Sequence, residues 1–466
     1  MSITSILNIA TSALFASQTC MQVTSNNVAN ADTDGYIRQT AVLNESASIN
    51  SSSGLLGSGV TVTTIEAIYD KYLEASVAEE NNAAEEWSVY ETYFGRIETI
   101  LDEENTNLSA NITDFFNAWQ ALSTDPTNST ALQGVVTAGE NMSQTIQNIY
   151  TELKNLQAEL NSSVTEEVDD VNNILGSIAE LNSQIYKEGV AGAEDATLIS
   201  QREELLKELS GIMDIQYFED ENGGLTVMTS NGKLLVDGVH ANELSVEDPG
   251  TGCHSVIWNS ASGASQDITD DISGGSLKAL IDLRDSQITA FIDELNGLAE
   301  SLATEVNSIH SSGYGANGTT GTNFFTEVST SGDYASIFAV SDEVETSTDY
   351  IAVSSSTEST TGNEIVLAIA ELGSASVTID GSSATFTDFC ASMESEIGSL
   401  SENAQDLSDY HANLLSALET ERDSISGVST DEEMTNLIKY QYAYQAAARL
   451  ITVAESLLDS LMEVLS

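Results

Sequence analysis

Both ends of the chain carry apolar side chains at a seven-residue spacing, which lets helices pack side by side as a coiled coil. Near the N-terminus, one line of large side chains is Leu7, Leu14, Met21 and Val28, and a complementary, mostly small line is Ile3, Ala10, Ser17 and Thr24. Near the C-terminus, the two lines are Leu437, Tyr444, Ile451, Leu458 and Leu465, and Tyr440, Ala447, Ala454 and Leu461. These segments predict two long terminal helices that pack against each other and against neighbouring molecules. At the start of the second helix, Ser429–Glu432 and Thr430–Glu433 both fit the S/T-x-x-E capping box, and Gly427 predicts a bend out of the preceding helix.

Charge is distributed unevenly along the chain. The sequence holds 13 lysines and arginines against 73 aspartates and glutamates, a formal net charge of −60. Residues 1–44 contribute only Asp32, Asp34 and Arg38, and residues 434–466 are almost as poor in charge. Such an acidic surface suggests a salty medium and repels phosphate backbones and anionic lipids, so we expect no nucleic-acid or membrane partner. Because both ends lack the excess of acidic residues found in the rest of the chain, we expect them to be shielded from solvent when the protein is at work.

Targeting and cysteine patterns add further expectations. No basic residue precedes Arg38, so the positively charged start of a secretory signal is missing. No run approaches the ~18 apolar residues that span a bilayer. We therefore expect a soluble protein that, if exported, leaves by a route that reads no such signal.

Cys20, Cys253 and Cys390 lie far apart without a CxxC pair, which favours small apolar residues or free thiols over a metal site or disulfide framework.

The central sequence predicts a mainly α-helical, elongated bundle with terminal coiled-coil segments and a small inserted β domain. Helical apolar spacing persists over about 128–187, and a four-residue slip after Leu160 indicates local unwinding of the supercoil. A helix of that length would reach ~80 Å, more than a compact globule needs. Further helices are predicted over 70–104, 108–123, 194–210 and 386–424, with helical heptads also over 281–309. Alternating apolar residues and the Asn231-Gly232 turn predict the β domain.

The predicted division of the chain follows from these patterns. A short β-like piece is expected at 59–69, and a short helix near 363–372 within a segment rich in Ser, Thr and Gly. The predicted parts are an N-terminal coiled-coil assembly segment (1–44), a first part of the helical bundle (45–210), the β domain (211–273), a second part of the bundle (274–310), an irregular insertion (311–385), a last part of the bundle (386–428) and a C-terminal coiled-coil assembly segment (429–466).

Catalytic and metal-binding patterns do not stand out. His240, His254, His310 and His411 lie in separate segments, none within metal-ligand spacing of another. His411 falls in an apolar seam, which favours a packed or hydrogen-bonded bundle histidine. No GxSxG, HExxH or Walker pattern occurs, and the carboxylate runs are expected on solvated faces and at helix starts. We therefore predict no enzyme, no catalytic residue, no cofactor and no metal.

A partial metal match lies in the stretch SNNVANADTDGYIRQ, residues 25–39. Its residues fit the first half of a calcium-binding loop at Asn30, Asp32, Asp34 and Gly35. The twelfth position, however, is Ala41 rather than a bidentate glutamate, and the ninth is Arg38. The interpretation we favour is that these residues end a helix and turn the chain, because Asn and Asp satisfy free helix-end groups and Gly accepts unusual backbone angles.

The same stretch resembles the signature of flagellar axial proteins, the proteins of rod, hook and junction. The matching residues are Ser25, Asn26, Asn27, Ala29, Asn30, Thr33, Gly35, Tyr36 and Arg38. The C-terminal part is similar to the closing segment of that group at Gly427, Val428, Asp431, Glu432, Glu433, Asn436, Tyr440, Gln441 and Tyr444. The internal strings QREELLKELS (201–210), GGSLKALIDLRD (274–285) and NSIHSSGYGANGTTGTNFF (307–325) favour the FlgK family of hook-filament junction proteins.

The resemblance implies a structural role at the junction of hook and filament, as mechanical adaptor and assembly platform. It implies a ring-like homo-oligomer in contact with the hook protein and with a second junction protein of the FlgL type. It also implies export through the flagellar type III pathway to the extracellular flagellum, with a FlgN-type chaperone on the C-terminal helix around Leu437 to Leu465. In the family, both termini pair as a coiled coil that lines the axial tube and are disordered before assembly.

The predicted assembly interface consists of the apolar seam positions. They are Ile3, Leu7, Leu14, Met21, Val28, Leu437, Tyr440, Tyr444, Ile451, Leu458, Leu461 and Leu465. Three alternatives remain open. The chain could be another axial protein of hook, rod or second-junction type, a type III secreted helical tip protein, or an adhesin or enzyme carried on the flagellum.

Overall fold

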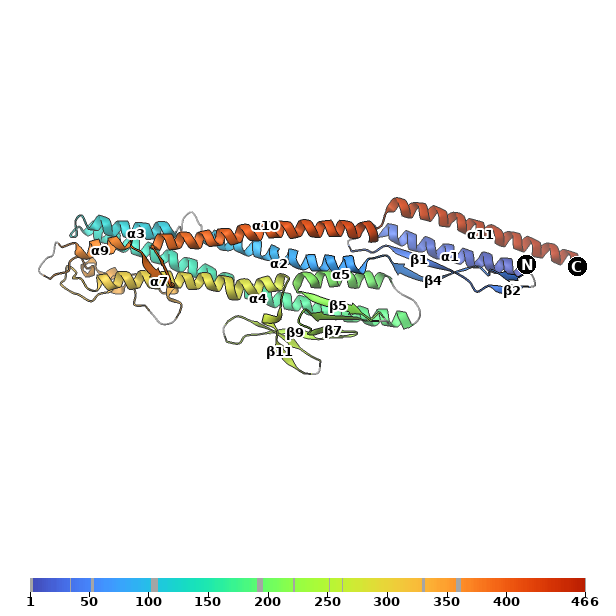
Figure 1. The fold of residues 1–466 in the computed structure, drawn as a ribbon, viewed down its shortest axis with the longest axis horizontal. Coiled ribbons are helices and arrows are strands. Elements are labelled where there is room, and N and C mark those ends of the chain that lie inside the picture. Colours follow the sequence, from blue (N-terminus) through green and yellow to red (C-terminus); the bar gives the residue numbers. More distant parts are fainter. Residues whose placement is uncertain are drawn as a thin grey trace.

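The computed structural model shows a long rod of helices with both chain termini at one end (Figure 1). It describes residues 3–33, 35–51, 54–101, 108–190, 196–220, 223–250, 252–261, 263–328, 332–357 and 362–465. Asp34 lies outside these residues, as do the side chains of Leu461 and Leu465. The mainly helical, elongated fold predicted from the sequence is confirmed.

One end of the rod, which we call the terminal unit, consists of the two terminal helices and a β hairpin. Helix α1 (Ile3–Ala29) lies along α11 (Thr430–Leu465), and β1 (Gln39–Glu45) pairs antiparallel with β4 (Val60–Ala67) beside α1. Strands β2 (Ile49–Ser51) and β3 (Gly54–Leu56) close the tip of the hairpin. The sequence predicted a β-like piece only at 59–69, which was incomplete. The strand that pairs with it begins at Gln39, opposite Ala67, and the pairing continues to Glu45 opposite Val60, with a bulge at Thr63.

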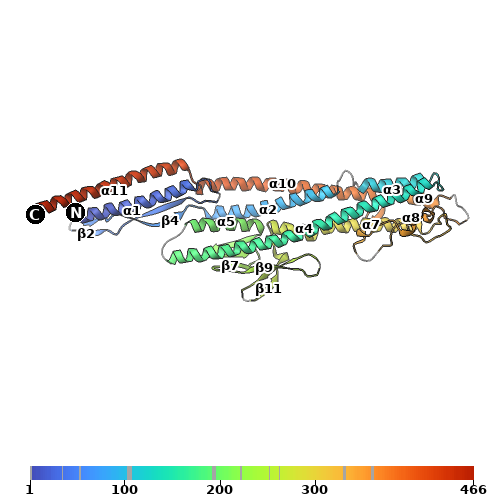
Figure 2. The ribbon, with the colours of Figure 1, turned by 180° about the vertical axis from the view of Figure 1, so that it is seen from behind.

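The middle of the rod is a bundle of long helices from early, middle and late sequence. They are α2 (Lys71–Leu101), α4 (Ser129–Val190), α5 (Ala196–Ile212), α6 (Ser276–Asp282), α7 (Ile288–His310) and α10 (Phe386–Ser426). A one-turn π-helix, Leu283–Gln287, joins α6 to α7. Helix α2 packs along both α10 and α5, and α4 packs on α5, α6 and α7 (Figure 2).

Helix α4 matches the predicted long helix closely. With 62 residues it spans roughly 90 Å at 1.5 Å per residue. Leu153, Leu160, Val164 and Val171 are fully buried or nearly so, so the four-residue slip predicted after Leu160 keeps the apolar stripe facing the core. Histidine 411 of α10 has its Nδ1 atom 2.6 Å from Glu80 Oε1 of α2, so it is a hydrogen-bonded bundle histidine as expected.

The β domain lies on the flank of α4. Strands β5 (Ile215–Glu219), β6 (Leu225–Thr229), β7 (Leu234–Asp237) and β8 (His240–Ala241) form one antiparallel sheet in that order. Strands β9 (Glu243–Glu247), β10 (Ser255–Asn259) and β11 (Ser265–Asp267) form another, with β10 central. The predicted turn at Asn231-Gly232 is present, and Gly232 adopts the positive φ of 81° that the turn requires.

The far end of the rod holds α3 (Leu108–Leu122) and the segment predicted to be irregular. Within that segment lie α8 (Asp342–Thr346), α9 (Glu364–Leu372) and a hairpin of β12 (Val377–Ile379) with β13 (Ser382–Ala384), so the predicted short helix is confirmed. Buried aromatic rings join it to α3 in one core. They are Phe115, Trp119, Phe324, Phe325 and Phe338.

His310 fastens this end of α7 to the loops around it. Its ring is fully buried, and Nδ1 donates to the Thr322 carbonyl at 2.8 Å while Nε2 accepts from the Ala352 backbone N–H at 3.0 Å. Because Nε2 accepts a hydrogen bond, the ring must be neutral. Burial favours this neutral form and lowers the pKa of His310 to about 4.

Acidification should therefore weaken the far end. The stability that His310 contributes is complete above its unfolded pKa of 6.5 and is lost as the pH falls toward 4. We expect the free energy of unfolding to fall by roughly 2–3 kcal/mol between pH 6.5 and 4.5 because of this side chain. Urea denaturation followed by tryptophan fluorescence measures it, since the ring centre of Trp119 lies 6.1 Å from that of His310.

The control is His310→Gln, which keeps a donor and an acceptor but takes up no proton. The carboxyl of Glu294 works in the opposite direction, because burial raises its pKa to about 7, but it is present in both proteins. The difference between the two proteins therefore isolates His310. An equal fall in the variant would contradict the assignment.

Candidate functional site

The buried face of the terminal helix pair is built from small side chains. On α1, Ala10, Ser17 and Thr24 are buried at seven-residue intervals, and they face an α11 whose Ala447 and Ala454 are also buried. Small residues let helix axes approach closely. The predicted pairing of the two ends is therefore present within one chain, with the small seam innermost.

Cys20 is also buried on this face of α1. Its thiol hydrogen-bonds the hydroxyl of Tyr440 on α11, and burial raises the pKa of both groups. Both groups therefore stay protonated at neutral pH. Cys20 packs as a small side chain, in agreement with the expectation for the three cysteines.

The larger seam positions are only partly covered. Ile3, Leu7, Leu14, Met21 and Val28 on α1 are half-buried, as are Leu437, Tyr440, Tyr444 and Ile451 on α11. Leu458 is exposed. The single chain therefore leaves apolar area on both sides of the small seam.

A second apolar face of α11 was missed by the sequence analysis. Its side chains are exposed and follow the helix on the side away from α1: Met434, Ile438, Tyr442, Leu450, Val453 and Leu457. Tyr442 and Val453 are 68% and 54% exposed. The signal was present, since these residues follow helical spacing among themselves, but the heptad seams obscured it. Large exposed apolar patches of this kind mark interaction surfaces.

Asn27 connects the end of α1 to the hairpin and to α11, and its side chain is 1% exposed. Its Nδ2 donates to the Gln39 carbonyl at 2.8 Å and to Glu433 Oε2 at 3.1 Å. Its Oδ1 accepts from the Gln39 N–H at 3.1 Å and from the Tyr36 hydroxyl at 3.0 Å. All hydrogen-bonding capacity of the amide is used, so Asn27 acts as a strand neighbour for the first residue of β1.

Arg38 completes this network, which we call the clasp (Asn27, Tyr36, Arg38, Gln39 and Glu433). The guanidinium of Arg38 lies 2.9 Å from Glu433 Oε1 through Nη2 and 3.2 Å from Glu432 Oε2 through Nη1. Its backbone N–H donates to the carbonyl of Ser426, the last residue of α10, at 2.8 Å. Glu433 is 2% exposed and receives bonds from both Asn27 and Arg38. The clasp therefore joins α1, the hairpin and the start of α11.

The remaining signature residues form the turn after α1. Asn30 Nδ2 donates to the Asn26 carbonyl at 2.9 Å, and Asn26 Nδ2 donates to the Tyr36 hydroxyl at 3.2 Å. Gly35 has a φ of +71°, a left-handed conformation that favours glycine, and a Cβ there would have to displace the carboxylate of Glu204. The other signature residues, Ser25, Ala29 and Thr33, are exposed. The predicted helix stop and turn are confirmed.

The C-terminal motif contains one correction. The pairs Ser429–Glu432 and Thr430–Glu433 were predicted as capping boxes, but both glutamate side chains reach Arg38 instead. Only a long bond of 3.4 Å from the Glu432 N–H to Ser429 Oγ remains of the box. For the buried carboxylate of Glu433, an ion pair with Arg38 is a stronger interaction than one backbone N–H.

Gly427 provides the predicted bend between α10 and α11. A Cβ there would collide with the carbonyl of Asp423, to which the Gly427 N–H donates at 2.9 Å. The other motif residues divide by exposure. Val428 and Asn436 are half-buried, whereas Asp431 and Gln441 are exposed.

Among the ranges given above, no helix is long and apolar enough to cross a membrane. In the same part of the chain, no three His, Cys, Asp or Glu side chains are grouped so that they could hold a metal ion.

Comparison with known proteins identifies the family. The model of the flagellar hook-associated protein FlgK helical domain matches residues 94–325. The models of the flagellar basal body rod protein and of the C-terminal part of rod FlgEFG proteins match 7–36 and 421–464. Flagellar hook-associated protein 1 of Bacillus subtilis is 28% identical over 98% of this chain and 97% of its own length. The chain belongs to the FlgK family of flagellar hook-associated proteins.

Two further relatives agree with this membership. Flagellar hook-associated protein 1 of Salmonella typhimurium is 25% identical over 99% of this chain and all of its own length. The solved structure of the flagellar hook junction protein FlgK from Burkholderia pseudomallei superposes with a TM-score of 0.67 at 14% identity. It covers 75% of this chain and all of the solved one, and it shares the fold. The terminal matches at 7–36 and 421–464 contain Asn27, Tyr36 and Glu433 of the clasp.

The clasp predicts that Asn27→Ala destabilises the terminal unit. The substitution leaves both backbone groups of Gln39 and one oxygen of the buried Glu433 without their partner, so we expect a loss of about 2–4 kcal/mol there. Amide hydrogen exchange of α1 and β1 measures it. Ser25→Ala changes an exposed residue of the same signature and should leave exchange unchanged. Equal exchange in both variants would refute the role of Asn27.

Proposed function

We propose that this chain works at the junction between the flagellar hook and filament, as a mechanical adaptor on which further assembly takes place. The observation that carries the proposal is the terminal helix pair, whose apolar faces stay uncovered in the single chain. Large apolar faces on a soluble rod call for partners. Family membership supplies the setting, a structural part of the bacterial flagellum.

In the proposed assembly, copies of this chain form a ring through the terminal unit. The half-buried seam and the outer face of α11 contact neighbouring copies and, on the side of the hook, the hook protein. A second junction protein of the FlgL type then adds to the opposite side. The low charge of the terminal segments supports this arrangement, because helices from many copies can approach closely without the repulsion that the acidic bundle would produce.

The proposal also covers the route to the assembly. The chain would be exported through the flagellar type III pathway, with a FlgN-type chaperone bound to α11. The exposed apolar face of that helix supports such a partner, since it would otherwise promote premature association. The long bundle and the clasp support the mechanical role, because continuous helices and a buried polar network resist bending at the base of the rod.

A charge on the outer face of α11 should block assembly without unfolding the monomer. We expect Val453→Asp to reduce swimming cells to less than a tenth of the wild-type number, because burying an unpaired carboxylate costs several kcal/mol at each contact. The same result is expected for a charge at Leu14 or Ile451, where the side chain is half-buried. Motility of a null strain complemented with each variant measures the effect.

Thr452→Asp is the matched control for Val453→Asp. Thr452 is also exposed but points about 100° away around the helix. Circular dichroism of both purified monomers must match the wild type. Normal motility of the Val453 variant would remove the outer face of α11 from the proposed interface.

Limited proteolysis of the monomer tests whether the ends order only on assembly. The terminal pair buries mainly small side chains, so we expect it to open before the bundle, whose core is apolar and continuous. A protease with broad specificity should remove roughly the first 40–60 and last 35–45 residues and leave a stable acidic core. Ends that stay protected would show that α1 and α11 are already firmly paired in the monomer.

A further inference from the structure

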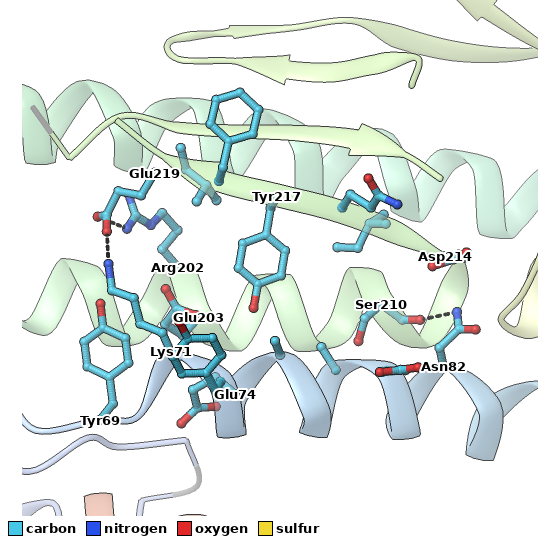
Figure 3. Close-up of a pocket in the computed structure, with 18 residues that line it drawn as sticks. Tyr69, Lys71, Glu74, Asn82, Arg202, Glu203, Ser210, Asp214, Tyr217 and Glu219 are labelled. Carbon is cyan, nitrogen blue, oxygen red and sulfur yellow. Dashed lines mark hydrogen bonds and ion pairs between the residues drawn. The ribbon is translucent and has the colours of Figure 1, made fainter. Parts of the chain in front are cut away.

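A cavity of about 830 Å³ lies between α2, α5 and β5, next to the terminal unit (Figure 3). Two cations on its wall share one carboxylate. Lys71 Nζ lies 2.6 Å from Glu219 Oε2, and Arg202 Nη2 lies 2.8 Å from Glu219 Oε1. The side chain of Arg202 is 1% exposed and is further held by Asn182 and the Gly223 carbonyl. Both cations are therefore directed toward Glu219.

Two other carboxyls in this cavity have no such partner. Glu74 projects from α2 and Glu203 from α5, and both side chains line this cavity (Figure 3). Within the described part of the chain, neither has a cation within ion-pair distance, and Glu74 Oε1 is shielded from solvent without a hydrogen bond. Burial raises the pKa of Glu74, and it raises that of Glu203 to about 7, with Glu74 and Glu219 adding to the shift and Arg202 and Lys71 opposing it.

The same two carboxyls also line a second cavity, of about 1010 Å³, that separates the terminal unit from the bundle. Its other walls are the signature turn, from Ala31 to Arg38, and the junction of α10 with α11, from Ser424 to Ser429. Glu74 and Glu203 thus lie where the terminal unit, with its clasp, contacts the helical bundle. A change in the spacing of α2 and α5 therefore changes the surface of the bundle that faces the terminal unit.

We propose that Glu74 and Glu203 form a proton-dependent latch. When one of the two carboxyls is protonated, α5 packs against α2. When the proton passes to water, this contact loosens, and with it the contact between the terminal unit and the bundle. Two carboxylates that line one cavity between packed helices repel each other, so one bound proton allows closer packing. Its consequence for flagellar assembly rests on the proposed function. The latch itself is a property of the monomer.

The charged and titratable groups around the pair favour this behaviour. Cations nearby are engaged elsewhere, Lys207 with Glu419 at 2.6 Å and Arg422 with Asp423 at 3.1 Å. The groups that face the pair are Tyr69, Lys71, Arg202, Glu204, Lys207, Tyr217, Glu219, Arg422 and Asp423. The tyrosines do not titrate near neutrality, since burial raises the pKa of Tyr69 and Tyr217.

The direction of the pH effect follows from the raised pKa of Glu203. Its contribution to packing is complete below the unfolded value of 4.5 and is lost as the pH rises through about 7. Opening of the α2–α5 contact should therefore increase by up to about tenfold per pH unit within that window and level off above it.

Hydrogen exchange of the full-length monomer tests the latch. The opening constant, corrected for intrinsic exchange, is measured between pH 5 and 8 for the start of α2, for α5 and for the signature turn. We expect at least a tenfold increase between pH 5 and 7 in the wild type. Glu203→Gln mimics the protonated carboxyl, so its profile should be flat and low. Glu208→Gln, on the exposed side of α5, should retain the wild-type profile.

The outcomes separate the latch from the proposed function. A wild-type profile in Glu203→Gln, or a flat profile in the wild type, overturns the latch and leaves the junction role untouched. Loss of motility in Val453→Asp has no bearing on the exchange result. If Glu203→Gln fails to fold by circular dichroism, Glu74→Gln is measured instead. It removes the repulsion but leaves Glu203 buried, so opening should rise less with pH than in the wild type, and an unchanged profile overturns the latch.

Discussion

Asn27 satisfies the backbone of a strand, a tyrosine hydroxyl and a buried carboxylate at the same time, and the geometry of the terminal unit depends on it. Coiled-coil seams of alanine and serine specify close packing but allow helices to slide by a turn. A buried polar network permits only one register, because any shift leaves Glu433 or Gln39 without a partner. The clasp therefore fixes the position of α1 against α11 close to where the terminal unit is connected to the bundle.

Asparagine has the same use along the rest of the rod. Asn172 of α4 exchanges two 2.8 Å bonds with the backbone of Leu244, and Asn307 of α7 holds the N–H groups of both Phe324 and Phe325 at 2.9 Å. Asn161 and Asn296 lie eleven residues earlier on the same two helices and bind loop backbone as well. Eleven residues are close to three full turns, so both members of each pair share a face. Long helices supply length, and their asparagines attach backbone of the β domain and of the far-end segments that lies against them.

The elements that follow from local spacing along the chain could be predicted from the sequence. The elements that depend on contacts between distant segments were missed. Helix α4, the turn at Gly232 and the bend at Gly427 follow from local spacing and backbone constraints. The first strand of the hairpin did not, because its partner lies after a connection that carries no strong turn signal. Glu432 and Glu433 fit a local capping pattern, but Arg38, almost four hundred residues earlier, binds them instead. Tertiary ion pairs of that kind leave no trace in local spacing.

The charge distribution gives the two halves of the rod different responses to salt. Exposed charges interact over about 8–10 Å at physiological ionic strength, so bundles that carry nearly all of the −60 charge repel when copies lie side by side. The terminal units carry a net charge of only −7 of it, −3 from residues 3–67 and −4 from residues 430–465, and are held by apolar contact and by a clasp that is largely buried. Added salt should therefore let neighbouring bundles approach more closely while the terminal units keep their packing. In the proposed ring, contact between copies would therefore begin at the terminal units and extend along the bundles only as far as screening allows.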